Sequence, residues 1–166
     1  MDSHAILGEI PRLRRYARAM LGDRAAADDL VQDTLERAWT RFAQWRVGSD
    51  LRAWLFGIMH NLRVDQLRRP ALATAPLDDY EEQWATRPTQ SDQLEVMDLA
   101  SALSQLPEEQ RAVVLLVALE DMSYAEVADA LGIPVGTVMS RLARGRERLR
   151  LIMAGQLSVN HLRVVR

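Results

Sequence analysis

The side chains best suited to contact a partner chemically are the hydroxyl, methionine and arginine groups of segment 137–148. Arginine forms paired hydrogen bonds with guanine edges and holds phosphates, and a small hydroxyl can approach a base closely. Between Pro134 and Arg150 there are five arginines and only one glutamate, so this segment is basic although the chain of 166 residues has a formal charge of -2. At helical spacing the outward positions form one face that suits the DNA major groove. These positions are Thr137, Met139, Ser140, Arg141 and Arg144.

The residues just before this segment have the pattern of a helix-turn-helix. Ser123 and Glu126 match a capping box, in which each side chain bonds the other residue's backbone N–H, so a helix begins there. Ala128 permits close helix crossing, Gly132 permits a sharp turn, and Pro134 starts the second helix. A plain helical hairpin with a solvated arginine face is the alternative, but the coincidence of these signals favours DNA binding. The apolar seam of the second helix is expected to consist of Val135, Val138 and Leu142.

Apolar residues recur at helical spacing along the whole chain, without the alternation that marks strands, so we expect an all-α fold. Residues 3–9 are expected to form a turn before the first helix. The second helix should bury Trp39 and the third should bury Trp54 and Leu67, whereas the pattern does not decide the position of Phe56. Outside the helix-turn-helix, the expected helices cover residues 10–21, 23–45, 50–68, 93–105 and 107–119.

Residues 70–92 have the composition of a linker, because they combine three prolines and many acidic side chains with little apolar periodicity. The sequence therefore predicts two small helical domains joined by an acidic, proline-containing linker, with three helices in the N-terminal domain and the helix-turn-helix in the C-terminal one. The predicted divisions are a domain over 1–69, a linker over 70–92, a second domain over 93–153 and a tail over 154–166.

Several function classes find no support in the sequence. The chain has no cysteine, and its three histidines are far apart in sequence, so we expect no metal site and no cofactor. Ser49, His60 and Asp65 are residue types that hydrolases use, but no nucleophile elbow or glycine-rich phosphate loop accompanies them, so we expect no enzyme. There is neither a secretory signal nor an apolar run long enough to cross a membrane, which predicts a cytoplasmic protein without membrane insertion.

Four sequence blocks follow one another along the chain, and together they carry a family resemblance. They are DDLVQDT at 28–34 with RAW at 37–39, LRAWL at 51–55, HNLRVDQLRR at 60–69, and VGTVMSRLAR at 135–144. In order and spacing these blocks resemble the extracytoplasmic-function (ECF) group of bacterial RNA polymerase sigma factors, over about residues 5–153. The resemblance identifies the N-terminal domain as sigma domain 2 and the C-terminal domain as sigma domain 4.

The resemblance implies a role for three sets of residues. The first set would hold core polymerase through its β′ clamp helices, and the β flap of polymerase is a further implied contact. The second set would recognise the minus-10 element and melt it to a single strand. The third set would read the minus-35 element as duplex promoter DNA. A base flipped from the minus-10 element would lie in the loop between Trp45 and Leu51, where phosphate contacts offset the cost of unstacking. The implied polymerase contacts are Asp29, Gln32, Asp33 and Arg37. The implied minus-10 contacts are Arg46, Ser49, Leu51, His60, Asn61, Arg63, Arg68 and Arg69. The implied minus-35 contacts are Thr137, Met139, Ser140, Arg141, Ala143, Arg144 and Arg148.

Two other functions stay open beside a sigma factor. A free-standing helix-turn-helix regulator would bind duplex DNA tightly without polymerase, and a decoy that only titrates an anti-sigma factor would not need Arg141 and Arg144 at groove-reading positions. The resemblance also implies regulation by an anti-sigma factor, through the 70–92 linker and the polymerase-docking residues. Three positions depart from the family pattern. Met139 stands where a lysine or arginine is common, Ala143 is small where some members have a larger residue, and the loop glycine Gly48 comes one residue later than usual.

Overall fold

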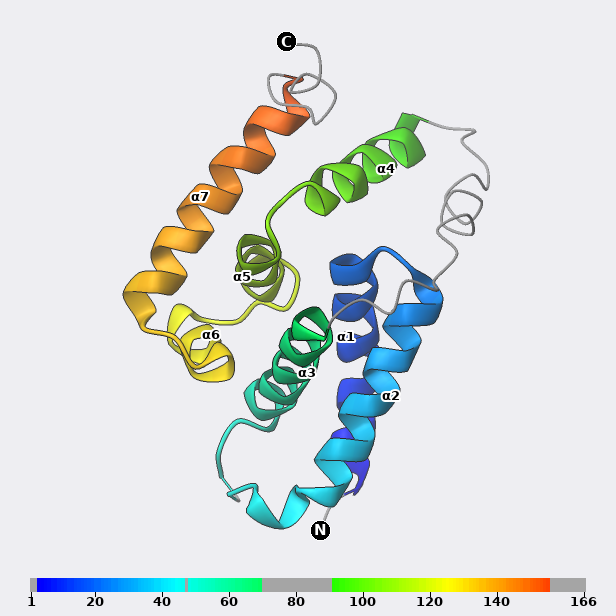
Figure 1. Cartoon of the computed structure of the whole chain (residues 1–166), viewed down its shortest axis with the longest axis vertical. Helices are drawn as coiled ribbons and strands as arrows, with labels where there is room; N and C mark the ends of the chain where they lie inside the picture. Colours follow the sequence, from blue (N-terminus) through cyan, green and yellow to red (C-terminus); the bar gives the residue numbers. More distant parts are fainter. Residues whose placement is uncertain (1–2, 47, 70–90, 156–166) are drawn as a thin grey trace.

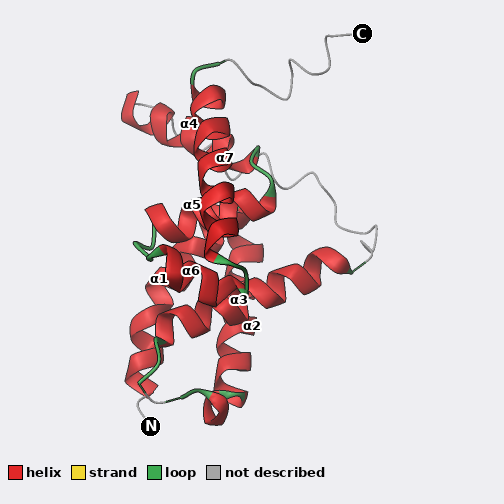
Figure 2. Cartoon of the chain, turned by 90° about the vertical axis from the view of Figure 1, so that its left-hand side faces the viewer, coloured by secondary structure: helices red, strands yellow, loops and turns green. Residues whose placement is uncertain are grey.

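A computed structural model describes residues 3–46, 48–69 and 91–155, and every regular element in that part of the chain is a helix (Figures 1 and 2). The predicted all-α fold is confirmed. The N-terminal half contains α1 (Ser3–Leu21), α2 (Arg24–Thr40), the 3-10 turn η1 (Phe42–Gln44) and α3 (Leu51–Arg68). The C-terminal half contains α4 (Ser91–Ser104), α5 (Glu108–Ala118), α6 (Tyr124–Leu131) and α7 (Val135–Met153).

Helix α1 is longer than the sequence pattern predicts. Residues 3–9 continue the helix instead of forming a separate turn, with Pro11 inside it. Proline removes one backbone hydrogen bond from a helix interior. The helix nevertheless extends toward the N-terminus, and Ile6 is buried on the same face as Leu13 and Met20. Burial of this apolar face therefore outweighs the local proline signal.

Helices α2 and α3 begin where aspartates cap them. Asp23 accepts a hydrogen bond from the backbone N–H of Ala25, and Asp50 accepts one from that of Arg52, so each satisfies an amide that the first helical turn leaves free. The core of this half is built around Phe56, whose ring meets that of Tyr16 edge to face at 5.1 Å between centroids. Phe56 is thus a core residue, which the sequence left undecided.

Three apolar side chains expected in the core lie at the surface instead. Trp39 on α2 is 59% exposed, Leu67 near the end of α3 is 53% exposed, and Val135 at the start of α7 is 43% exposed. Each stands at the edge of its helix's apolar stripe or in an end turn, where periodicity fixes the face least well. Trp54 is half-buried and packs against the edge of the core.

The C-terminal half has the predicted helix-turn-helix, formed by α6 and α7. Ser123 accepts a hydrogen bond from the Glu126 amide at 3.1 Å, and Gly132 ends α6 in the left-handed conformation with φ of 65°. That conformation is strained for most side chains, which explains the glycine. Val138 and Leu142 are buried against α6 and α5 as expected. Gly145 allows α7 to approach α5, because a Cβ there would lie 2.7 Å from a Val114 methyl carbon.

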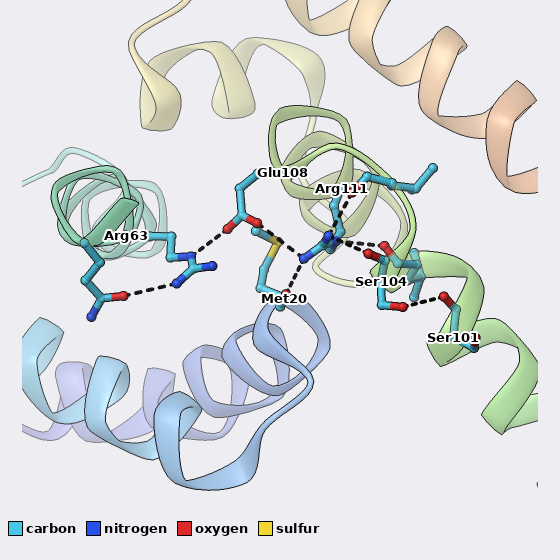
Figure 3. Close-up of polar contacts among 9 residues, drawn as sticks. Met20, Arg63, Ser101, Ser104, Glu108 and Arg111 are labelled. Carbon is cyan, nitrogen blue, oxygen red and sulfur yellow. Dashed lines mark hydrogen bonds and ion pairs between the residues drawn. The ribbon is translucent and has the colours of Figure 1, made fainter. Parts of the chain in front are cut away.

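The two halves pack against each other in this structure. Helix α3 lies along α6, while α1 contacts α4 and α5 (Figure 1). Arg111 on α5 is one polar link between them, since its guanidinium donates to the Met20 carbonyl at the end of α1 at 2.6 Å (Figure 3). It also donates to the carbonyls of Leu103 and Ser104 in the last turn of α4 and to that of Leu106 in the segment that follows. Burial lowers the pKa of Arg111 from its ordinary range, but a guanidinium stays charged and suits the negative ends of two helices.

The predicted linker over 70–92 and tail over 154–166 lie almost wholly outside the described residues, so the domain boundaries remain predictions. None of the described helices combines the length and apolar character needed to cross a bilayer.

Candidate DNA-binding and polymerase-docking surfaces

The outward side of α7 carries the residues predicted for the minus-35 element, which we call the recognition face. Val138 and Leu142 hold the other side of the helix in the core, so this face is fixed in direction. Met139 is 53% exposed, and the Ser140 hydroxyl bonds the Thr137 carbonyl one turn earlier at 3.3 Å. The exposed members of the recognition face are Met139, Ser140, Ala143, Arg144 and Arg148, and the half-buried members are Thr137 and Arg141.

A second surface lies on α2, opposite the buried residues that face α1 and α3. Asp29, Gln32 and Asp33 are exposed on successive turns, and Arg37 is half-buried one turn further on. We call these four residues the docking face. Thr34 lies between them in sequence but is fully buried, with its hydroxyl bonded to the Leu30 carbonyl at 2.7 Å. The rigid position of α2 on the core therefore presents the docking face outward as a unit.

The docking face continues into an open groove shared with the end of α3. Asp33 and Arg37 line this groove together with Arg69, which belongs to the predicted minus-10 set. The groove mixes acidic and basic side chains, whereas the recognition face is basic. The two surfaces therefore suit different partners, one a protein with complementary charges and the other a polyanion.

The segment between α2 and α3 is supported by three aromatic rings. Phe42, Trp45 and Trp54 surround one another with ring centroids 5.5 to 6.5 Å apart. All three residues are half-buried. Ser49 closes the turn by donating its hydroxyl to the Arg46 carbonyl at 2.6 Å. The arrangement places the exposed Arg46 and Ser49 beside an aromatic platform, which is the chemistry that an unstacked base requires.

The other predicted minus-10 residues divide into two groups. Asn61, Arg68 and Arg69 are exposed, whereas Leu51, His60 and Arg63 are half-buried. Arg63 donates to Glu108 of α5 at 2.6 Å, so its charge is paired across the two halves (Figure 3). Burial and the nearby positive charge of Arg141 hold the pKa of His60 below its ordinary range, with Glu108 opposing them.

The structure also shows polar residues that join the two halves and that the sequence did not single out. Glu120 is fully buried and its carboxylate accepts two hydrogen bonds from Arg15 of α1. Arg52 of α3 donates to the Glu120 carbonyl and pairs with Glu126 of α6 at 2.9 Å. Glu126 was expected to reach back to Ser123. No local sequence signal reveals these pairs, because the partners are 68 to 105 residues apart.

Comparison with protein families matches both halves of the chain. Residues 6–60 match the Sigma2 domain of PhyR, and residues 97–149 match Sigma-70, region 4. These matches cover the docking face on one side and the recognition face on the other. The prediction of two helical sigma domains is thereby confirmed.

Similar proteins cover nearly the whole chain. The ECF RNA polymerase sigma factor EcfG of Rhodopseudomonas palustris is 37% identical over 89% of this chain and 82% of its own length. SigW of Bacillus subtilis is 30% identical over 79% of this chain and 77% of its own length. The sigma factor RpoE of Bartonella quintana, solved with the anti-sigma factor NepR, superimposes with a TM-score of 0.73 at 30% identity, covering 98% of this chain and 97% of that one.

The similarity to these proteins extends over both domains. These domains contain the helices that carry the predicted polymerase, minus-10 and minus-35 residues. A free-standing regulator built on the helix-turn-helix alone would not share the N-terminal half. The chain belongs to the ECF family of RNA polymerase sigma factors, the DNA-binding proteins that direct promoter-specific initiation of transcription.

Proposed function

We propose that the chain holds core RNA polymerase through the docking face, reads a minus-35 element with the recognition face, and recognises and melts the minus-10 element with α3 and the loop before it. This assignment of separate contacts is supported by the presence of two exposed surfaces that differ in charge. The acidic docking face lies on α2 and the arginine-rich recognition face lies on α7.

The docking face suits a protein partner that presents basic side chains, which the proposal identifies as the β′ clamp helices. Asp29, Gln32 and Asp33 are exposed acceptors at i, i+3 and i+4 on one helix, so a partner helix can meet them together. The β flap is proposed as the partner of the C-terminal domain. Because polymerase and the chromosome are in the cytoplasm, we place the protein there.

The recognition face suits the major groove. Ser140 and Met139 lie in the first turns of α7 and can approach base edges, while Arg144 and Arg148 lie further along and can hold phosphates. The aromatic platform of Phe42, Trp45 and Trp54 supports the proposed single-strand contacts, because rings beside an arginine and a hydroxyl stabilise a base removed from its stack.

An anti-sigma factor is the proposed regulatory partner. RpoE of Bartonella quintana and CnrH, the latter at 27% identity with a TM-score of 0.69, were both solved with such partners. In this chain a cavity of about 210 Å³ opens between the two halves. It offers an apolar site with charged edges, which suits one face of an amphipathic helix. Its apolar lining includes Tyr16, Met20, Leu30, Met59, Val64 and Leu67, and its charged edge includes Arg63, Arg68 and Glu108.

Two variants measured by two assays test the residue assignment. Arg144→Ala should reduce transcription from the promoter that the protein selects while core binding is unchanged, because it removes a DNA contact only. Asp33→Ala should weaken binding to core polymerase. Arg146→Ala on the same helix and Asp98→Ala on α4 are matched controls, since both residues are exposed and belong to neither surface. Equal loss of both activities in Arg144→Ala would contradict the assignment.

A further inference from the structure

Met139 is a large apolar side chain on a face that is otherwise polar, basic or small. It is 53% exposed, although its neighbours Val138 and Leu142 on α7 are buried in the core. These two residues fix the helix, and with it the side on which Met139 stands. Because half of the methionine stays in water, its burial against a partner would be favourable.

Small neighbours leave this side chain accessible along the helix. Gly136 and Ala143, one turn before Met139 and one turn after it, are both exposed. A Cβ added to Gly136 would have nothing within 4 Å, so the helix surface is open there. Met139 is the longest side chain within residues 136–140. It therefore reaches furthest toward a partner that approaches this turn of α7.

The chemistry of methionine limits what Met139 can recognise. Its side chain carries no charge and no N–H or O–H group, and its sulfur is only a weak acceptor. It can therefore neither hold a phosphate nor distinguish the polar groups of the bases. The major-groove edges of the four base pairs present one apolar group, which is the C5-methyl of thymine. An apolar contact at this position thus discriminates thymine from the other bases.

We propose that Met139 recognises a thymine of the minus-35 element by packing its thioether against the C5-methyl group. This inference rests on the proposed function, which places the recognition face in the major groove, and it names the base that residue 139 contacts there. A basic side chain at the same position would hold a phosphate whatever the base sequence. The methionine therefore makes this contact depend on sequence rather than on charge.

Deoxyuridine tests the contact, because it pairs as thymine does and lacks only the C5-methyl group. The holoenzyme is bound to a promoter found by mapping of RNA starts, and each thymine on either strand of the minus-35 element is replaced in turn. At one thymine the parent should lose affinity by about fourfold, the factor expected when one buried methyl group is removed. Met139→Ala should bind the thymine and deoxyuridine duplexes equally at that position.

Three further variants separate the methyl contact from other effects of substitution. Met139→Leu keeps an apolar side chain and should keep a loss of similar size. Met153→Ala removes a methionine of the same helix that is 48% exposed but lies beyond the recognition face, and it should keep the parent profile. Met139→Arg should bind without regard to the methyl group, because a phosphate contact takes the place of the thymine contact.

A loss at one thymine that Met139→Ala abolishes supports the proposal. A minus-35 element without an A·T pair would overturn it, as would a Met139→Ala variant that weakens thymine and deoxyuridine duplexes alike. Arg144→Ala shows whether the proposed function itself has failed, because it should weaken binding to all of these duplexes equally. If Arg144→Ala also leaves binding unchanged, α7 does not lie on the promoter. If Arg144→Ala weakens binding and the methyl group has no effect at any position, only the thymine contact is wrong.

Discussion

Both carboxylate oxygens of Glu120 accept hydrogen bonds from the guanidinium of Arg15, at 3.1 and 3.0 Å. The Glu120 side chain is wholly buried, whereas that of Arg15 is half exposed. A carboxylate out of water needs a partner, because removing that partner leaves an uncompensated charge. The hydrogen bonds with Glu120 also raise the pKa of Arg15. This single pair therefore joins the first helix of one domain to the segment that precedes the helix-turn-helix of the other.

A double-mutant cycle on this pair should show strong coupling. Arg15→Ala should destabilise the protein more than the Arg15→Ala, Glu120→Gln double variant, because the double variant no longer buries a lone charge. We expect a coupling free energy on the order of 1 kcal/mol from urea unfolding of all four proteins. Additive effects of the two substitutions would show that the pair is not coupled in solution. Arg12→Ala, at an exposed position of the same helix, is the control.

Arg111→Lys should lower the thermal stability although it keeps the positive charge. Lysine cannot donate to the Met20 carbonyl and to the carbonyls of Leu103, Ser104 and Leu106 in one planar arrangement, so partly buried acceptors lose their donors. We expect a loss of about 3 kcal/mol, which corresponds to a fall of roughly 6–12 °C in Tm. Arg150→Lys is the control, since Arg150 is 62% exposed and pairs only within its own helix turn. Equal Tm values for the two variants would contradict the role of Arg111.

Acidification should open the contact between the domains. In the closed form, burial and Arg141 depress the pKa of His60, with Glu108 opposing, whereas in the open form the imidazole returns toward its ordinary 6.5. The open form then binds more protons, so the closed form is favoured above this ordinary value and is lost as the pH falls below it. Spin labels attached through Arg14→Cys and Arg146→Cys, one on each domain of this cysteine-free chain, report the separation. In pulsed electron resonance the fraction of molecules at the closed-form distance should decrease between about pH 7.5 and pH 5.5. His60→Gln should flatten that profile, and a profile unchanged by the substitution would assign the effect to another group.

Met139→Arg should strengthen binding of the holoenzyme to its own promoter. Met139 is 53% exposed on the recognition face, at a position where the resemblance implies that a basic residue would contact DNA. An added phosphate contact should make the slope of log affinity against log salt steeper by about one. Met153→Arg places the same charge on α7 beyond the recognition face and should leave the slope nearly unchanged. Identical slopes for both variants would mean that position 139 does not face DNA.

The sequence predicted the helix-turn-helix and the helix caps because their signals are local. Ser123, Gly132 and Asp50 act within four residues of themselves, and each does in the structure what its type and spacing indicate. The hydrogen bonds and backbone angles involved belong to a single helix end, so they can be predicted without knowing the rest of the fold. The apolar face of α7 followed the 3.6-residue period through Val138 and Leu142 for the same reason.

The contacts between domains could not be predicted in this way. Glu120 and Glu126 look in the sequence like ordinary surface acids, and their partners Arg15 and Arg52 lie on helices of the other domain. The periodic pattern also failed for Trp39 and Leu67, since it shows which residues share a face but not how far a neighbouring helix covers that face. Which residues contact polymerase and DNA remains a prediction that the family assignment supports.

Transcription in vitro with purified bacterial core polymerase on genomic DNA, followed by mapping of the RNA starts, tests the sigma function most directly. The account predicts a set of starts that appear only when this protein is added, preceded by two shared sequence elements at the minus-35 and minus-10 positions. Arg144→Ala should weaken these starts, and Arg146→Ala should not. A complete absence of starts that depend on the protein, with a core polymerase that is active with another sigma factor, would contradict it.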